Sequence, residues 1–241
     1  METMNLDILC FSAHPDDVEL SCSGTVMKHI DLGYKVGIID LTKGELGTRG
    51  SAELRLQEAE NASRILGLSC RENLGLADGF FRKDEETLLK IIAKIRQYQP
   101  KIVLCNSEID RHVDHGRASD LIEEACFLSG LRKIETQSDG NQQEAWRPTS
   151  IYHYIQDRMQ TPDLLIDISP YMDRKIESIK AFSSQFYDAN SKEPETPISG
   201  EFFLDFIKSR AMEFGRNINV KYAEGFTVRR TISANNLMDL I

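Results

Sequence analysis

Three histidines and three aspartates fall into two short segments whose composition suits a divalent metal site. They are His14, Asp16 and Asp17 in "AHPDD", and His112, Asp114 and His115 in "HVDH". Imidazole and carboxylate without thiolate form a ligand set that suits zinc or another divalent transition metal. A catalytic zinc typically takes three protein ligands and keeps one open position for water. Together the two segments hold enough ligands for such a site.

The order of residues within each segment indicates how roles could be divided. Asp16 and Asp17 are adjacent, so their side chains diverge, and one can bind metal while the other addresses the attacking water. In the second segment one histidine can bind metal while the other faces the substrate. Asp114 can hold a ring nitrogen there and favour the charged imidazole. A metal that lowers the pKa of water, a carboxylate base and an imidazolium facing an oxyanion are the components of amide hydrolysis.

Each segment follows an apolar run that predicts a buried strand, at residues 6–13 and 101–107. Predicted strands alternate with predicted helices over the first 130 residues. The further strands cover 35–45 and 70–79, and the helices cover 20–34, 51–66, 84–100 and 116–130. This alternation predicts parallel βαβ units. Because ligands bind beyond the carboxyl ends of strands in an open α/β sheet, the two segments converge if their strands are neighbours.

The second half of the chain continues the same pattern less regularly. A polar loop is expected over 131–149, strands over 150–156 and 164–169, a helix over 171–186, a disorder-prone stretch over 188–200 and a last helix over 201–215. The sequence contains no repeat or linker. We therefore expect one α/β domain over residues 1–241, with a mostly parallel, Rossmann-like sheet, helices on both faces and the active site at the carboxyl ends of the strands.

Each segment alone also has an ordinary structural interpretation. "AHPDD" can be a turn in which Asp16 or Asp17 caps a helix, and "HVDH" can be a solvated loop. Their joint position after two predicted parallel strands favours the site. The remaining histidines are assigned no function, because His29 lies in a predicted helix and His153 in an apolar strand that suits a core histidine.

Composition excludes several other classes of protein. The net charge of −9 argues against a nucleic-acid partner, because phosphate binding needs clustered Lys and Arg. No apolar run is long enough to span a membrane, and the first residues lack the features of a signal peptide. The cysteines are odd in number and form no CxxC pair, which favours free thiols in a reducing cytoplasm.

The two histidine motifs resemble those of the LmbE-like/PIG-L family of zinc-dependent N-acetylglucosamine deacetylases. The stretches "DLTKGELGTRGSAELRLQEAENASRILG", "RENLGLADG", "SSQF" and "KYAEGF" resemble one branch of it, the deacetylases that remove acetate from N-acetylglucosaminyl malate in bacillithiol biosynthesis. The resemblance implies a cytoplasmic enzyme with a small-molecule sugar substrate. It also implies a Zn²⁺ cofactor, with Fe²⁺ or another divalent metal as the alternative, and a homo-oligomer, a trimer or hexamer.

The resemblance also assigns roles to individual residues. The implied metal ligands are His14, Asp17 and His115, the general base is Asp16, the residue that stabilises the oxyanion or protonates the leaving amine is His112, and the carboxylate that orients it is Asp114. Glu45 and Arg55 match positions that hold the sugar or its aglycone.

Two further arginines, Arg111 and Arg147, are candidates for binding the malate carboxylates, because Arg binds carboxylates bidentately. A surface ion pair is the alternative for each arginine, Arg55 included. Tyr154 and Tyr187 are candidates for a tyrosine near the oxyanion. Val113 stands where relatives often carry proline.

Three alternatives to this function remain open on sequence grounds. The substrate could be another N-acetylglucosaminide, such as a chitooligosaccharide or an antibiotic precursor. Adjacent aspartates after a first parallel strand also occur in magnesium-binding receiver modules, although that interpretation leaves His14, His112 and His115 without a role. The chain could also be a catalytically silent relative with a binding role.

Overall fold

The strand that leads to His14 lies inside the sheet, with a neighbouring strand on each side. The computed structural model describes residues 4–138, 140–186, 189 and 191–240. Its main sheet has seven strands in the order β3-β2-β1-β4-β7-β9-β8. They are β1 (Ile8–Ser12), β2 (Val36–Thr42), β3 (Cys70–Leu76), β4 (Ile102–Cys105), β7 (Ser150–Tyr154), β8 (Leu164–Asp167) and β9 (Ala223–Thr227). The five from β3 to β7 are parallel, which confirms the predicted mostly parallel sheet.

The chain adds strands first on one side of β1 and then on the other. From β1 the chain adds β2 and β3 on one side, then returns to place β4 on the other side of β1 and β7 beyond it. Crossovers that leave in opposite directions open a crevice at the carboxyl ends of the two strands where they diverge, here β1 and β4. Both strands precede a predicted histidine motif, so the topology brings the two motifs together.

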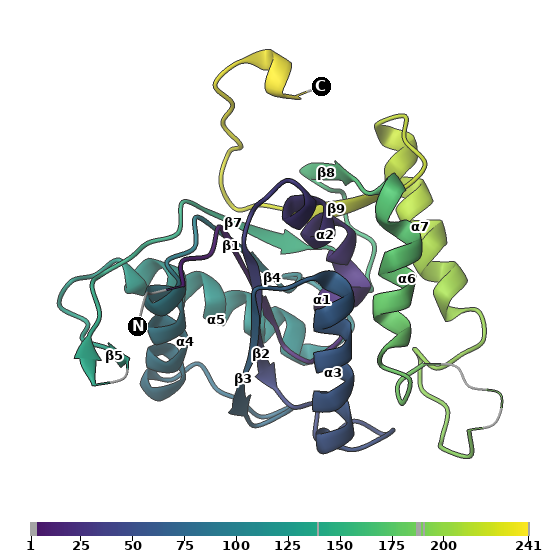
Figure 1. The fold of residues 1–241 in the computed structure, drawn as a ribbon, viewed down its shortest axis with the longest axis horizontal. Coiled ribbons are helices and arrows are strands. Elements are labelled where there is room, and N and C mark those ends of the chain that lie inside the picture. The colour runs from purple at the N-terminus through teal and green to yellow at the C-terminus, as the bar shows by residue number, and fades with distance from the viewer. Residues whose placement is uncertain (1–3, 139, 187–188, 190, 241) are drawn as a thin grey trace.

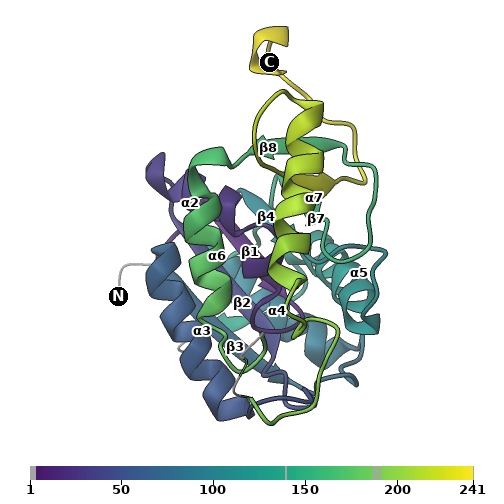
Figure 2. The ribbon, with the colours of Figure 1, turned by 90° about the vertical axis from the view of Figure 1, so that its right-hand side faces the viewer.

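Helices cover both faces of the sheet (Figure 1). On one face lie α4 (Glu85–Tyr98) and α5 (Val113–Ser129), which bury Ile91, Ile95 and Leu121 against the strands. On the other lie α2 (Ser23–Asp31), α3 (Ala52–Leu66), α6 (Met172–Lys180) and the short α1 (Asp17–Ser21). Figure 2 shows α6 beside α7 (Phe203–Asn217), which packs on β9.

Local signals in the sequence explain where the long helices begin. Ser51 accepts a hydrogen bond from the Leu54 amide and caps α3, and Asp84 does the same for Thr87 and α4. Gly67, with a φ of 79°, ends α3 in a left-handed conformation. The predicted helices over 51–66 and 84–100 are confirmed.

Several predicted boundaries are corrected. The helix expected over 20–34 is two helices, α1 and α2, which meet at Cys22, and the carboxylate of Glu224 accepts from the first amides of α2, Gly24 and Thr25. The helix expected from 116 begins at Val113, so the second histidine motif forms its first turn. The helix expected over 171–186 ends at Lys180.

Three smaller features complete the fold. The loop over 131–149 contains a short hairpin, β5 (Gln137–Ser138) and β6 (Asn141–Gln142). The segment 220–230 supplies β9, which runs antiparallel between β7 and β8. Short 3₁₀ turns cover Ser169–Tyr171 and Leu237–Leu240. None of the helices in the described part of the chain is long and apolar enough to cross a membrane.

Candidate active site

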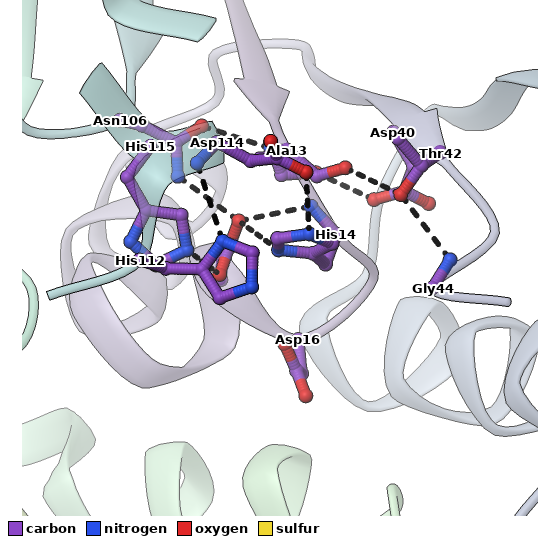
Figure 3. Close-up of polar contacts among 12 residues, drawn as sticks. Ala13, His14, Asp16, Asp40, Thr42, Gly44, Asn106, His112, Asp114 and His115 are labelled. Atoms are coloured by element: carbon purple, nitrogen blue, oxygen red, sulfur yellow. Dashed lines mark hydrogen bonds and ion pairs between the residues drawn. The ribbon is translucent and has the colours of Figure 1, made fainter. Parts of the chain in front are cut away.

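The loops that follow β1 and β4 lie side by side at the predicted crevice. The register of the two strands pairs Ile8 with Ile102 and Cys10 with Leu104, so both strands end at the same level. The Ala13 amide donates to Asn106 Oδ1 at 2.8 Å and fastens one loop to the other. Figure 3 shows the side chains of His14, His112 and His115 gathered at this point.

The carboxylate of Asp17 lies between two of these imidazoles. Its Oδ1 is 3.2 Å from His115 Nε2, and its Oδ2 is 3.7 Å from His14 Nδ1. Amide side chains hold it there: Asn106 Nδ2 donates to Oδ2 at 2.9 Å and Gln156 Nε2 donates to Oδ1 at 2.6 Å. The structure thus brings together the three predicted metal ligands.

The far nitrogen of each of these two histidines meets another carboxylate. His14 Nε2 is 3.0 Å from Asp78 Oδ1, and His115 Nδ1 is 2.6 Å from Asp110 Oδ2. Metal-ligating histidines usually donate their second ring N–H to such a group, which fixes the ring and the tautomer. Asp78 and Asp110 are not among the site residues predicted from the sequence. Their signal was the same as that of His14, since each follows the carboxyl end of a strand, β3 or β4.

The electrostatics of the cluster favour positive charge between the carboxylates. Burial by itself lowers the pKa of His14, but Asp114, Asp17 and Asp78 outweigh it and raise that pKa well above its usual value. Burial also lowers the pKa of His115, but Asp17 and Asp110 outweigh it and raise that pKa to about 9. Burial would raise the pKa of Asp17, yet His115 and His14 hold it well below its usual range.

Asp16 occupies a strained position between β1 and α1. Its φ is 114°, a region that residues other than glycine rarely adopt, and it is only 3% exposed. Asp16 Oδ2 accepts from Arg55 Nη2 at 2.7 Å, and its side chain does not cap α1. Burial raises its pKa although Arg55 opposes the shift. The strain turns Asp16 away from Asp17, as expected for two carboxylates with different roles.

His112 is the N-cap of α5, and its Nδ1 accepts from the Asp114 amide at 3.2 Å. The Asp114 carboxylate does not take the predicted place against His112: it meets Arg117 at 2.6 Å and the Gly79 amide at 2.8 Å, with His14 Nε2 at 3.4 Å. Burial and the nearby His14 and His115 lower the His112 pKa, in contrast to the expected imidazolium. Because Nδ1 accepts from this amide, a neutral His112 carries its proton on Nε2.

The four residues predicted to bind substrate are not gathered in one place. Arg55 is buried in the site, against Asp16 and the Gly44 carbonyl; Gly44 has a φ of 66°, and a side chain there would collide with the Arg55 guanidinium. Glu45 is exposed on the loop after β2 and accepts from the Asp78 amide. Arg111 lies at the rim in the loop after β4, paired with Asp157.

Arg147 is not brought to the site. Its guanidinium stacks over Phe127 at 4.5 Å and donates to the Phe127 carbonyl, near the end of α5. Since α5 begins at the site and rises about 1.5 Å per residue, Phe127 lies roughly 20 Å away along the helix. Arg147 precedes β7, so it lies at the amino ends of the strands. There it cannot contact a molecule bound at the histidine cluster.

The remaining candidates fall outside the cluster or outside the described residues. Tyr154 is fully buried beneath the sheet and donates to the Phe11 carbonyl, which removes it as an oxyanion donor. Tyr187 lies outside the described residues. His153 is buried between Glu123 and the Asn106 carbonyl, as predicted for a core histidine, and His29 bonds back to Thr25 in its own helix.

The donor set fits a divalent metal ion. The ligand atoms of His14, His112 and His115 lie within 4.8 Å of one another, and so do those of His14, Asp78 and Asp114. His14 and His115 direct one nitrogen at Asp17 and are held from behind by a carboxylate, which is the arrangement that a metal-binding histidine needs. Imidazole with carboxylate and no thiolate suits zinc or a similar transition metal.

Known proteins resemble this chain in sequence and in fold. Residues 9–126 match the family model described as "PIG-L: GlcNAc-PI de-N-acetylase". The crystal structure of the conserved protein TT1542 from Thermus thermophilus is 34% identical, with a TM-score of 0.84 over 95% of this chain and 97% of that chain. The chain belongs to the PIG-L/LmbE-like deacetylase family.

The relatives that this chain matches differ in what they act on. The diacetylchitobiose deacetylase of Thermococcus kodakarensis is 28% identical over 231 residues, 90% of this chain and 81% of that protein. The 4-oxalmesaconate hydratase of Pseudomonas putida is 26% identical over 246 residues, 93% of this chain and 90% of that protein. Membership of the family therefore identifies the fold of this chain, but it does not identify the substrate.

Proposed function

We propose that this protein is a metal-dependent N-deacetylase that hydrolyses the N-acetyl group of an N-acetylglucosaminide to acetate and the free glucosamine. One observation carries the proposal. The Asp17 carboxylate lies 3.7 Å from His14 Nδ1 and 3.2 Å from His115 Nε2, and Asp16, the neighbour of Asp17, is buried against Arg55. A metal ligand set beside a separate carboxylate is what hydrolysis of an amide by activated water requires.

In this proposal His14, Asp17 and His115 would hold a zinc ion, or Fe²⁺ or another divalent metal in its place. Such an ion lowers the pKa of water and polarises the amide carbonyl. Asn106 and Gln156 keep the Asp17 carboxylate turned toward the histidines, and Asp78 and Asp110 keep the two rings in position.

The acid–base steps fall to Asp16 and His112. Asp16 Oδ2 is held by Arg55, and Oδ1, which bonds to none of the described residues, takes a proton from the attacking water. The water oxygen bonds to the acetyl carbon, and a neutral His112 donates from Nε2 to the carbonyl oxygen as it gains charge. Asp16 then passes its proton to the sugar nitrogen, the C–N bond breaks, and acetate leaves.

The specific substrate that we propose is N-acetylglucosaminyl malate. The motifs after β2 and β3 support it, as does a 24% identical relative from Bacillus anthracis, a probable N-acetyl-alpha-D-glucosaminyl L-malate deacetylase 2, matched over 74% of this chain and 81% of that protein. Arg111, which is exposed in the loop after β4 and pairs with Asp157, would in this proposal bind a carboxylate beyond the sugar. A chitooligosaccharide is the alternative, favoured by the similarity to the Thermococcus kodakarensis enzyme.

A hydratase is the second candidate function, because the Pseudomonas putida hydratase matches nearly the whole chain. Both reactions add the oxygen of water to a carbon atom of the substrate. A hydratase returns the proton to carbon and releases no acetate, so the products separate the two functions.

The deciding assay offers the zinc-loaded protein three acetylated substrates, GlcNAc-malate, N-acetylglucosamine and diacetylchitobiose, and measures acetate release. A parallel reaction with 4-oxalmesaconate follows the loss of its ultraviolet absorbance. We expect acetate from GlcNAc-malate at the highest kcat/KM. Turnover of diacetylchitobiose alone would reassign the substrate, and hydration without any acetate release would replace the deacetylase proposal.

We further propose that residues 1–241 act as one catalytic domain, that the protein assembles as a homo-oligomer, a trimer or hexamer, and that it works in the cytoplasm. Sedimentation equilibrium of the purified protein tests the assembly, with a monomer mass contradicting it.

A further inference from the structure

His153 of β7 is a buried titratable residue that no step of the proposed deacetylation uses. Its side chain is fully buried, and its register partner in β4 is Cys105. Its Nε2 lies 3.0 Å from Glu123 Oε1 on α5, and its Nδ1 lies 3.1 Å from the carbonyl oxygen of Asn106. The histidine therefore connects a carboxylate on one helix to the first residue after β4.

The contacts of the ring identify His153 as an imidazolium ion. A peptide carbonyl oxygen and an ionised carboxylate accept hydrogen bonds but donate none, so both ring nitrogens must carry a proton. The hydrogen bond from His153 lowers the pKa of Glu123, which keeps this carboxylate ionised near neutral pH. Burial lowers the pKa of His153, but Cys105 and Glu123 outweigh it and raise that pKa to about 11. Ser119 Oγ, 2.9 Å from Nδ1, can share the N–H with the Asn106 carbonyl. His153 and Glu123 thus form a buried ion pair.

A buried ion pair is a costly way to fill the core of a protein. Each charge that leaves water loses several kcal/mol of hydration, and an apolar side chain of similar size would fill the same space without this loss. What an apolar side chain could not supply is the N–H that His153 donates to the Asn106 carbonyl. The ion pair therefore directs attention to Asn106.

Asn106 joins the two loops of the site through its side chain. Its Oδ1 accepts from the Ala13 amide at 2.8 Å, directly before His14. Its Nδ2 donates to Asp17 Oδ2 at 2.9 Å and is 3.2 Å from Gln156 Oε1. Asn106 is fully buried, so a shift of its backbone would displace all of these contacts together. The position of the Asn106 backbone thus sets the position of the Asp17 carboxylate.

We propose that His153 is a positioning residue of the metal site. Its Nδ1–H fixes the Asn106 carbonyl, and Glu123 keeps the proton on that nitrogen by stabilising the imidazolium. Asn106 in turn holds the Asp17 carboxylate toward the two metal-binding histidines. This role rests on the proposed metal site, and His153 acts through Asn106 rather than by contact with metal or substrate.

Glu123→Gln tests this role with a minimal change of shape. The glutamine can still accept from Nε2, but it lets His153 lose the Nδ1 proton, so that a bare nitrogen would face the Asn106 carbonyl. We expect zinc affinity to fall about tenfold, the lower end of the effect of residues behind metal ligands, and His153→Gln should lower it at least as far. Competition with a chromophoric chelator measures the affinity. His29→Gln is the matched control, because His29 bonds to the Thr25 carbonyl within its own helix.

Amide hydrogen exchange of the metal-free proteins tests the same role without zinc. The Ala13 amide reports on Asn106, whereas the Leu6 amide donates to the Tyr98 carbonyl at the other end of β1. In Glu123→Gln we expect exchange at Ala13 to accelerate about tenfold with exchange at Leu6 unchanged, because one hydrogen bond is loosened locally. A histidine that merely stabilised the fold would change both amides together.

Unchanged exchange at Ala13, or equal acceleration at Ala13 and Leu6, would overturn the role, as would nitrogen NMR signals of a neutral His153 ring near neutral pH. Equal zinc affinity in wild type and Glu123→Gln would also overturn it, whereas a wild-type protein that binds no zinc would overturn the proposed metal site itself. If His153→Gln fails to fold, Glu123→Gln still decides the role, because the Glu123 side chain is partly exposed.

Discussion

The two loops that supply the histidines position their side chains in different ways. The loop after β1 is buried, with His14, Asp16 and Asp17 at most 7% exposed, and it contains the strained φ of Asp16. The loop after β4 is open to solvent, with Ile109 61% and Val113 69% exposed. The first positions its side chains by an unusual backbone conformation. The second relies on the regular backbone geometry of the first turn of α5.

The difference follows from the spacing of the residues. His112 and His115 are three positions apart at the start of α5, one helical turn, and their rings stack with centroids 5.2 Å apart. Regular helix geometry is enough to place both on one side. Asp16 and Asp17 are adjacent and need separate directions, which the positive φ supplies. The four predictions below test this contrast, from the largest expected effect to the smallest.

The largest effect is expected from the histidines, which should behave unequally within the second loop. His14→Ala and His115→Ala, one in each loop, should lose stoichiometric zinc and all measurable turnover. His112→Ala should keep zinc and lose about 10²–10³-fold in kcat, because it removes one donor to the oxyanion. Elemental analysis of the dialysed proteins and acetate release measure the two properties. Loss of zinc from His112→Ala would instead identify a three-imidazole metal site.

Replacement of the base should separate activity from metal binding in the first loop. Asp16→Asn retains the size and the positive φ of the native residue but cannot accept a proton, so kcat should fall by about 10²–10⁴-fold with zinc unchanged. Steady-state kinetics and zinc content check this. An activity within about tenfold of wild type would assign the base elsewhere.

The carboxylates that contact the far nitrogens of the two metal-binding histidines should contribute equally to zinc affinity in both loops. Asp78→Asn weakens the support of His14 and Asp110→Asn that of His115, and each should reduce zinc affinity by about 10–100-fold. Competition with a chromophoric chelator measures the affinity. Asp157→Asn is the control, because Asp157 pairs with Arg111 and touches neither histidine. An unchanged affinity in Asp110→Asn would show that its 2.6 Å contact does not support the metal site.

The smallest effect concerns backbone strain and should have opposite signs in the two loops. Asp16→Gly should be more stable than Asp16→Ala by about 1 kcal/mol, since both lose the Arg55 pair but only glycine tolerates the positive φ. Val113→Gly, at the first position of α5, should be less stable than Val113→Ala by about 0.5–1 kcal/mol. Urea unfolding of the metal-free proteins measures both differences. Equal stabilities of Asp16→Gly and Asp16→Ala would show that the loop is not strained.

Sequence patterns predicted the part of the site that depends on strand order. "AHPDD" and "DRHVDHG" follow apolar runs, and parallel strands end at a common edge, so their convergence could be expected. The same patterns could not indicate β9, whose antiparallel position depends on contacts with β7 and β8 far away in the chain. They also placed the helix start three residues too late, because His112 itself is an unusual cap.

The sequence by itself determined which residue types were available for the chemistry and which strands would carry them. Only the tertiary structure decided the partners. It set Asp78 and Asp110 behind the histidines, Gln156 against Asp17 and Arg55 against Asp16, and it left Arg147 at the opposite edge of the sheet. Local patterns follow from backbone geometry within a few residues. These contacts instead join loops that meet only after the strands between them have taken their order in the sheet.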